Sequence, residues 1–279
     1  MGASARGLVE LTRPVNSVAA GALTFVGGYV GGGARAEPAM LALAVVATVF
    51  AVAGGNAIND YFDRDVDRIN DPERPIPRGA VTPRDALAFS GVLFALAVGA
   101  VLVLPWPALV IAVVNLLALL AYTELFKGLP GVGNAVVAYL GGSTFLFGAA
   151  AVGRLGTAAW VLFALATLST FGRELVKDVE DLAGDEAEGL RTLPVVAGER
   201  TTLAVAAVAI GVAVLASPLP YLVGAFGAAY LAVVVPADGV MLYAAVRSFA
   251  DAGAAQRVVK YGMFLATLAF VAGRLAVGS

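Results

Sequence analysis

The stretch AINDYFDRDVDRINDPERPIPRG, residues 57–79, follows a long apolar run and concentrates charge in a chain that is 60% hydrophobic. Five aspartates fall within a dozen positions, and four arginines are mixed among them: Asp60, Asp63, Asp65, Asp67 and Asp71, with Arg64, Arg68, Arg74 and Arg78. Like charges at this spacing repel one another. The cluster therefore calls for compensating cations, a solvated position, or both.

The composition is that of a polytopic membrane protein. Charged residues make up 14% of the chain, against roughly 25% in an ordinary globular domain. The 279 residues include no Cys and no His, which excludes disulfides, zinc fingers, thiol nucleophiles and histidine acid–base chemistry. We expect one intramembrane domain over residues 1–279, with the lipid bilayer as its main partner and no nucleic acid.

Long apolar runs predict an all-α bundle of nine transmembrane helices. A span needs about 20 largely apolar residues, and Gly-Pro-rich turns such as LPWP at 104–107 and SPLP at 217–220 separate neighbouring runs. The predicted spans are 15–32, 39–58, 86–104, 107–123, 132–152, 157–176, 201–217, 219–240 and 258–277.

Positive charge predicts the orientation, because Lys and Arg accumulate on the cytoplasmic side of membrane proteins. With nine spans, fifteen of the 18 Lys and Arg residues fall on one face, and only Arg35, Arg154 and Arg274 fall on the other. This places the N-terminus and the acidic stretch on the cytoplasmic side of a cell membrane.

The acidic stretch forms a regular pattern at the end of the second predicted span. Asn59, Asp63 and Asp67 are spaced i, i+4, i+8, so a helix would align them in one stripe. Asp60 would lie beside that stripe. The second span thus ends in a row of carboxylates at the cytoplasmic surface.

A second stretch, FGRELVKDVEDLAGDEAEGLRT at 171–192, repeats the pattern at the end of the sixth predicted span. Lys177, Asp181 and Asp185 are again spaced i, i+4, i+8, and Glu174 and Asp178 lie on the neighbouring stripe. Spans two and six run in the same direction, so both acidic rows should reach the same face. The pattern predicts a parallel internal repeat of four spans.

Two explanations of these rows compete. Solvated surface loops, neutralised by neighbouring arginines, would explain either row alone. Matched spacing, side and position favour divalent cations instead, since Mg²⁺ prefers oxygen ligands shared between carboxylates and substrate phosphates. A diphosphate held at a membrane surface above an apolar bundle suggests a prenyl diphosphate. Ionising the allylic C–O bond of such a substrate leaves a carbocation. Aromatic side chains would shield this cation or simply pack in the core; the candidates are Tyr122, Tyr139, Phe145 and Phe147.

The motifs resemble those of the UbiA superfamily of intramembrane prenyltransferases. NDYFDRDVD at 59–67 is similar to the first motif of that family, NDxxDxxxD, and DLAGD at 181–185 to its second, DxxxD. The basic NDPERPIPRG at 70–79 and the nine-span layout are also of this type. The resemblance covers nearly the whole chain and implies a UbiA-like fold.

The resemblance implies a metal-dependent site, carried over residue by residue. Asn59, Asp63 and Asp67 would hold one Mg²⁺–diphosphate face, and Asp181 and Asp185 the other, so that two ions are expected and the four aspartates are catalytic. Asp60 and Asp178, on the neighbouring stripes, join the candidate metal ligands. The candidate substrate-binding residues are Asn16, Asn59, Arg74, Arg78, Tyr122, Lys127, Tyr139 and Lys177.

Three stretches resemble one archaeal branch of the superfamily more closely: RGLVELTRPVNS at 6–17, GNAVVAYLGGSTFLFG at 133–148 and GRELVKDVEDLAGD at 172–185. That branch implies transfer of a geranylgeranyl group from geranylgeranyl diphosphate to geranylgeranylglyceryl phosphate, giving digeranylgeranylglyceryl phosphate for archaeal ether lipids. The alternatives are an aromatic, quinone or tetrapyrrole acceptor and, from other classes, a cation transporter or a purely structural membrane protein.

Overall fold

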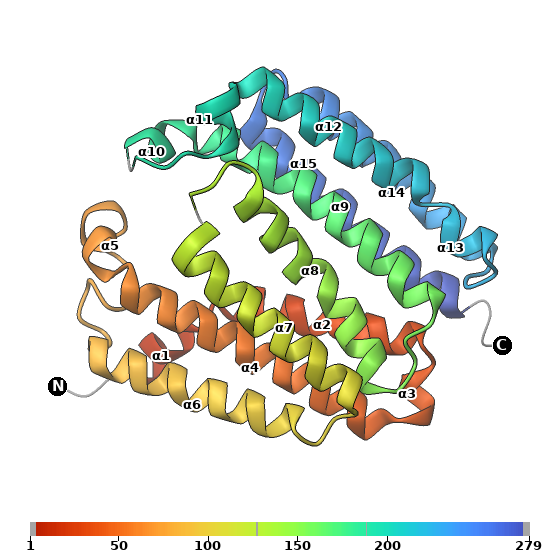
Figure 1. The fold of residues 1–279 in the computed structure, drawn as a ribbon, viewed down its shortest axis with the longest axis horizontal. Helices are drawn as coiled ribbons and strands as arrows, with labels where there is room; N and C mark the ends of the chain where they lie inside the picture. Colours follow the sequence, from red (N-terminus) through yellow and green to blue (C-terminus); the bar gives the residue numbers. More distant parts are fainter. Residues whose placement is uncertain (1–3, 127, 188, 276–279) are drawn as a thin grey trace.

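The computed structural model describes residues 4–126, 128–187 and 189–275, and helices and turns without any strand make up this part of the chain (Figure 1). The first half contains α1 (Ala5–Leu11), α2 (Pro14–Val30), α3 (Gly33–Ala36), α4 (Pro38–Phe62), α5 (Arg64–Asn70), α6 (Pro83–Val101), α7 (Trp106–Ala121) and a π-helical turn, η1 (Tyr122–Phe126). The second half contains α8 (Val132–Ala151), α9 (Thr157–Glu180), α10 (Leu182–Ala187), α11 (Leu193–Ala197), α12 (Glu199–Ala216), α13 (Leu219–Leu222), α14 (Ala228–Arg247) and α15 (Ala252–Leu275).

The prediction of an all-helical membrane bundle is confirmed. Among the described residues, 7 helices are long and apolar enough to cross a membrane: α4, α6, α8, α9, the α12–α13 stretch, α14 and α15. The shorter apolar helix α7 and the 17-residue α2 occupy the two remaining predicted spans. Local sequence signals mark where several helices begin. A proline is the first residue of α2, α4 and α6, and at the start of α6 the Thr82 hydroxyl accepts a hydrogen bond from the Asp85 N–H.

The predicted span at 219–240 is wrong at its start. The SPLP sequence does not separate the two spanning helices: Ser217 and Pro218 form a turn only between α12 and the short α13, whose first turn tolerates a proline. Pro220 lies in the short α13 that extends the direction of α12. The chain reverses only after Gly224, which has a φ of 71° that a glycine adopts without strain. The next spanning helix, α14, therefore begins at Ala228.

The helices pack in the same order in both halves of the bundle. In the first half, α4 packs between α2 and α6; in the second, α9 packs between α8 and α12. This order agrees with the predicted four-span repeat. Contacts of α2 with α8 and of α15 with both α2 and α9 join the two halves.

The junction between α2 and α8 is a direct contact of backbone with backbone. A Cβ at Gly148 would overlap the carbonyl oxygen of Thr24, and one at Gly27 would overlap the carbonyl of Phe145. Small residues permit such close approach in membrane bundles, where van der Waals packing rather than the hydrophobic effect holds helices together. These glycines therefore set the distance between the two halves.

Gly148→Ala should destabilise the protein, because the added methyl group has no space between α2 and α8. Overpacking of this kind costs about 1–3 kcal/mol. Thermal unfolding in detergent should show a clearly lower midpoint for this variant. Gly91→Ala in α6 is the matched control, since a Cβ there meets no atom within 4 Å. Equal midpoints for the two variants would contradict the close contact.

Candidate active site

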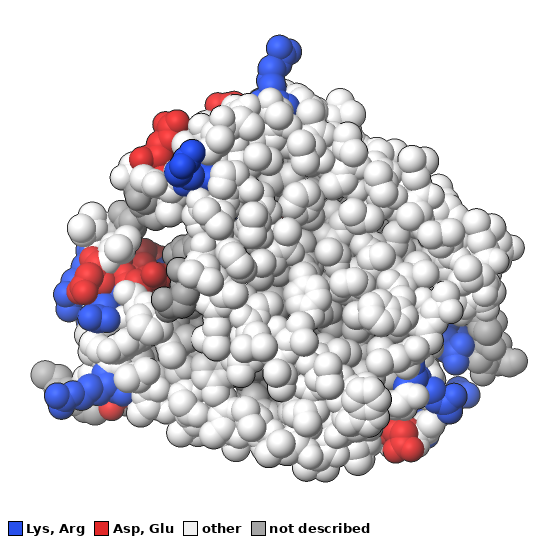
Figure 2. All heavy atoms as spheres, viewed as in Figure 1, with Lys and Arg blue, Asp and Glu red and all other residues white. Residues whose placement is uncertain are grey.

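The two acidic motifs lie at the same end of the bundle, as predicted. In Figure 1, α5 and α10 project from this end, whereas α3 and α13 lie at the opposite end. Figure 2 shows acidic side chains on both sides of a hollow at the same place, with most of the remaining visible surface uncharged. The apolar surface suits the hydrocarbon of a bilayer, and the charged end suits its aqueous boundary.

The first motif crosses a helix end rather than lying on one straight helix. Helix α4 ends at Phe62, and Asp63 has a φ of −81° and a ψ of −1° before α5 begins. The Asp63 N–H still donates to the Asn59 carbonyl (2.9 Å), and the Asp67 N–H to that of Asp63 (2.8 Å). The backbone therefore keeps the predicted i, i+4 hydrogen bonds through the helix end. The three side chains differ in exposure: Asn59 is exposed, Asp63 half-buried and Asp67 buried.

Asp67 is buried against an arginine. Its Oδ2 accepts from Arg74 Nη1 at 2.9 Å, and Arg74 Nε donates to Asp71 Oδ2 at 3.1 Å. Burial raises the pKa of Asp67 above its ordinary value, and the nearby charges of Asp60 and Asp63 act in the same direction, while Arg74 opposes them. Arg74 thus provides much of the positive charge that the first motif needs.

Arg78, predicted to bind substrate, joins the basic loop to α1. Its guanidinium is paired with Glu10, and both side chains are about one-third exposed. The hydrogen bond from Arg78, together with that from Arg6, lowers the pKa of Glu10. The loop that carries Arg74 and Arg78 is therefore held against the N-terminal helix.

The second motif has a different set of partners. Lys177 Nζ lies 2.9 Å from Asp181 Oδ2, and Asp185 Oδ2 accepts from the Thr192 hydroxyl at 2.9 Å. Asp178 Oδ2 accepts from Asn134 Nδ2 at 2.8 Å. Two of these three aspartates thus receive a hydrogen bond from a neutral donor, so less of their negative charge is neutralised by neighbours.

Three further polar residues at this end lie outside the predicted site residues. Asn134 reaches Asp178 from α8, Thr192 reaches Asp185 from the N-terminus of α11, and Asn56 in α4 donates to the Thr12 carbonyl at 3.1 Å. A lone Asn within an apolar run was the available signal for Asn134 and Asn56. Nothing in the local sequence identified their partners.

Three other residues predicted to bind substrate are Asn16, Tyr122 and Lys127. Asn16 is exposed on α2. Tyr122 is half-buried in η1, which packs against α7 and α8. Lys127 lies outside the described residues.

The aromatic candidates lie within the bundle. Tyr139 packs edge-on against Phe163 of α9, with ring centroids 6.0 Å apart. Phe145 and Phe147 are buried in the core. A cavity of about 80 Å³ near Phe145, lined also by Asp238, is too small for a 20-carbon chain.

The oxygen donors of the two motifs fit a metal that is shared with a substrate. In the described part of the chain, no three Asp or Glu side chains converge closely enough to hold an ion by themselves. Mg²⁺ typically takes one or two carboxylates and completes its octahedron with water and substrate phosphates. Asn59, Asp63, Asp67, Asp181 and Asp185 are donors of that kind, at one end of the bundle.

An integral membrane bundle with two Asp-rich motifs at one end is the architecture of an intramembrane prenyltransferase. Residues 20–268 match the model of the UbiA prenyltransferase family. The chain belongs to the UbiA prenyltransferase family and is a prenyltransferase.

Within this family, the chain is similar to particular named proteins and solved structures. The digeranylgeranylglyceryl phosphate synthase of Natronomonas pharaonis is 63% identical over 272 residues, covering 98% of each chain. A solved structure from work on digeranylgeranylglyceryl phosphate synthase in membranes has a TM-score of 0.84 and 34% identity, covering 97% of this chain and 98% of the other. A UbiA homologue from Archaeoglobus fulgidus bound to GPP and Mg²⁺ shares the fold, with a TM-score of 0.72 at 19% identity over 98% and 100% of the two chains.

Replacing Asp63, Asp67, Asp181 or Asp185 by Asn should each reduce prenyl transfer about a hundredfold or more, the usual effect of losing one preorganised electrostatic contact. The assay is turnover by purified, folded protein at saturating substrate. Asp65→Asn is the matched control within the first motif, because the Asp65 side chain is 63% exposed and pairs with Arg68. If the four variants match Asp65→Asn, the motifs are solvated loops rather than catalytic groups.

Proposed function

We propose that this prenyltransferase moves a geranylgeranyl group from geranylgeranyl diphosphate to geranylgeranylglyceryl phosphate, forming digeranylgeranylglyceryl phosphate. The main support is the 63% identity, over 98% of both chains, to a relative named digeranylgeranylglyceryl phosphate synthase. The acidic motifs at one end of the bundle supply the chemistry that such a transfer requires. The product belongs to archaeal ether-lipid synthesis.

The reaction depends on Mg²⁺, held by Asn59, Asp63 and Asp67 on one side and by Asp181 and Asp185 on the other. We expect two ions, since two motifs share one diphosphate. The fold relative from Archaeoglobus fulgidus, which binds GPP and Mg²⁺, supports this choice of metal. When bound, Mg²⁺ neutralises the diphosphate and stabilises its departure.

The residues of the chain then bind and orient the two substrates. Arg74 and Lys177 lie next to Asp67 and Asp181, respectively, and would contact the departing diphosphate as its C–O bond to the prenyl carbon breaks. The acceptor hydroxyl oxygen forms the new ether bond to that carbon and loses its proton. Because the chain has no His, the base is a carboxylate, a water or the released diphosphate.

The acceptor carries a second anionic group, so it needs cations of its own. Arg78 lies on the same basic loop as Arg74, and its pairing with Glu10 fixes it beside α1. We assign Arg78, together with Lys127, to the glycerol phosphate. The charged end of the bundle, and with it the N-terminus, faces the cytoplasm, because most Lys and Arg lie on that side.

Purified protein should form the diether from geranylgeranyl diphosphate and geranylgeranylglyceryl phosphate and release diphosphate. EDTA should abolish turnover and added Mg²⁺ should restore it, which product chromatography will show. Turnover undiminished in chelator would contradict the role of the metal. Prenylation of a quinone precursor, with none of the glycerol phosphate, would favour an aromatic acceptor instead.

Arg78→Ala should raise the KM for the glycerol phosphate about tenfold, because a charge-assisted contact to phosphate is lost. The KM for the prenyl diphosphate should change little. Arg84→Ala, an exposed position at the start of α6, is the control and should resemble the unmodified enzyme. A larger effect on the prenyl diphosphate would move Arg78 to the diphosphate side of the site.

A further inference from the structure

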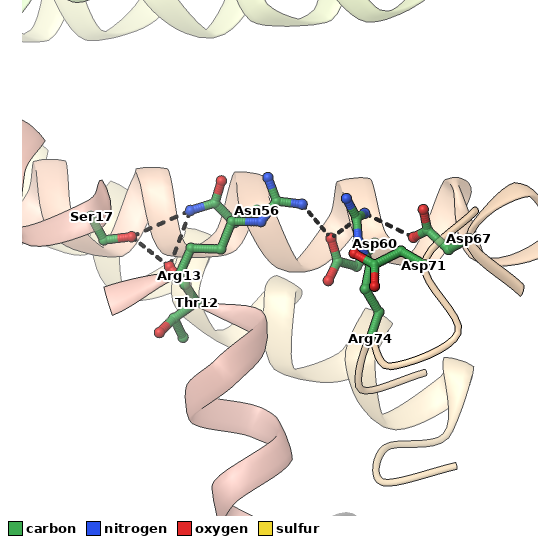
Figure 3. A network of polar contacts seen from close by, with 8 residues as sticks. All are labelled: Thr12, Arg13, Ser17, Asn56, Asp60, Asp67, Asp71 and Arg74. Carbon is green, nitrogen blue, oxygen red and sulfur yellow. Dashed lines mark hydrogen bonds and ion pairs between the residues drawn. The ribbon is translucent and has the colours of Figure 1, made fainter. Parts of the chain in front are cut away.

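Asp60 is a buried carboxylate shared by two arginines from different parts of the chain (Figure 3). Its Oδ1 accepts from Arg13 Nη2 at 2.7 Å and from Arg74 Nη1 at 3.4 Å. The Asp60 side chain is only 5% exposed, whereas those of Arg13 and Arg74 are 43% and 30% exposed. The two guanidiniums therefore cover the carboxylate and leave part of their own surface accessible.

The backbone around Arg13 is arranged to direct that side chain toward Asp60. Among the described residues, Arg13 is the only non-glycine with a positive φ (44°), a conformation that a residue with a Cβ adopts only when its surroundings enforce it. The carbonyl of Thr12 accepts from the Ser17 hydroxyl at 2.7 Å and from Asn56 Nδ2 at 3.1 Å. These bonds, drawn in Figure 3, fasten the junction of α1 and α2 to α4.

Arg74 approaches the same oxygen from the loop that follows α5. It also contacts Asp67 and Asp71, so its guanidinium links α4, α5 and the loop. Asp60 thus joins the start of α2, the end of α4 and the basic loop. An isolated pair of guanidiniums this close together would repel, and the buried carboxylate between them offsets that repulsion.

This geometry argues against Asp60 as a metal ligand, the role that the sequence pattern suggested. The Asp60 oxygen faces two guanidiniums, whereas Asp67 faces one, so Asp60 is the less available of the two to a divalent ion. Each guanidinium has five N–H donors. Asp60 takes one from Arg13, whereas Asp60, Asp67 and Asp71 together engage Nε and Nη1 of Arg74 and leave its Nη2. The Nη2 donors of Arg74 and the remaining donors of Arg13 are left for an anion, and paired guanidiniums bind phosphate oxygens well.

We propose that Asp60 is a positioning residue that holds Arg13 and Arg74 together as a phosphate-binding pair for the diphosphate of the prenyl substrate. The inference rests on the proposed function and adds Arg13 to the substrate-binding residues. Asp60 acts through the arginines, and the metal is held by Asn59, Asp63 and the other motif carboxylates.

The number of bound metal ions shows whether Asp60 is a metal ligand or a positioning residue. The probe is Mn²⁺ with saturating inorganic pyrophosphate, and electron paramagnetic resonance counts the ions bound per full-length protein in detergent. Asp60→Asn should retain the ions of the unmodified protein, whereas Asp63→Asn should lose one. Loss of an ion by Asp60→Asn would overturn the proposal. If Asp63→Asn and Asp181→Asn also retain every ion, the metal site of the proposed function fails instead.

Pyrophosphate affinity tests whether Asp60 works through Arg13. Asp60→Asn should weaken pyrophosphate binding about tenfold, the equivalent of about 1.4 kcal/mol, because Arg13 and Arg74 would no longer be held together, and Asp60→Glu should recover much of that loss. In an Arg13→Gln background, Asp60→Asn should weaken binding further by less than about threefold, since coupled residues are not additive. Fully additive losses would overturn the proposal.

Folding is checked by gel filtration and thermal unfolding. If Asp60→Asn does not fold, Arg13→Gln alone carries the test, because the paired guanidiniums predict weaker pyrophosphate binding for that variant too. Unchanged pyrophosphate affinity in folded Arg13→Gln would overturn the proposal.

Discussion

Repulsion among carboxylates gathered at one end of an apolar bundle is the constraint on which the rest of the structure depends. Charge is costly inside hydrocarbon, so the acidic groups of both motifs lie at helix ends on the same side. The structure relieves the repulsion differently in the two motifs. Asp60 and Asp67 are buried against arginines, whereas Asp178 and Asp185 receive hydrogen bonds from Asn134 and Thr192. The second motif therefore keeps more of its negative charge for cations that arrive with a substrate.

The apolar scaffold matters because it sets the distance between these groups. Helix α2 begins beside Arg13, and helix α8 carries Asn134 in its first turn. The backbone contact at Gly27 and Gly148 holds α2 and α8 together further along the bundle. A rigid contact between these two helices fixes the positions of Arg13 and Asn134, which contact the aspartates of the two motifs. No long loop has to become ordered to position them. Sites built on packed helices are positioned more accurately than sites on loops.

The interior of the bundle distinguishes this protein from an ion carrier. Asp238 is the acidic residue furthest from the helix ends, and it accepts a hydrogen bond from Ser217 at 2.6 Å beside a cavity of about 80 Å³. A transporter needs a succession of such groups along its path. Here most acidic groups are concentrated at the charged end of the bundle, at the aqueous boundary of the membrane (Figure 2). That arrangement suits a transferase acting on lipids.

The sequence by itself determined the class of this protein. Apolar runs about 20 residues long predicted the helices, and the spacing of Asn59, Asp63 and Asp67, repeated at Lys177, Asp181 and Asp185, predicted two acidic rows at one end. Both signals are local, because helix periodicity relates residues only three or four positions apart. Only the tertiary structure decided which groups meet: Arg13 pairs with Asp60 across 47 positions, and Asn134 with Asp178 across 44. Such contacts depend on how helices pack, and each motif's own spacing carries no information about the helix that lies opposite.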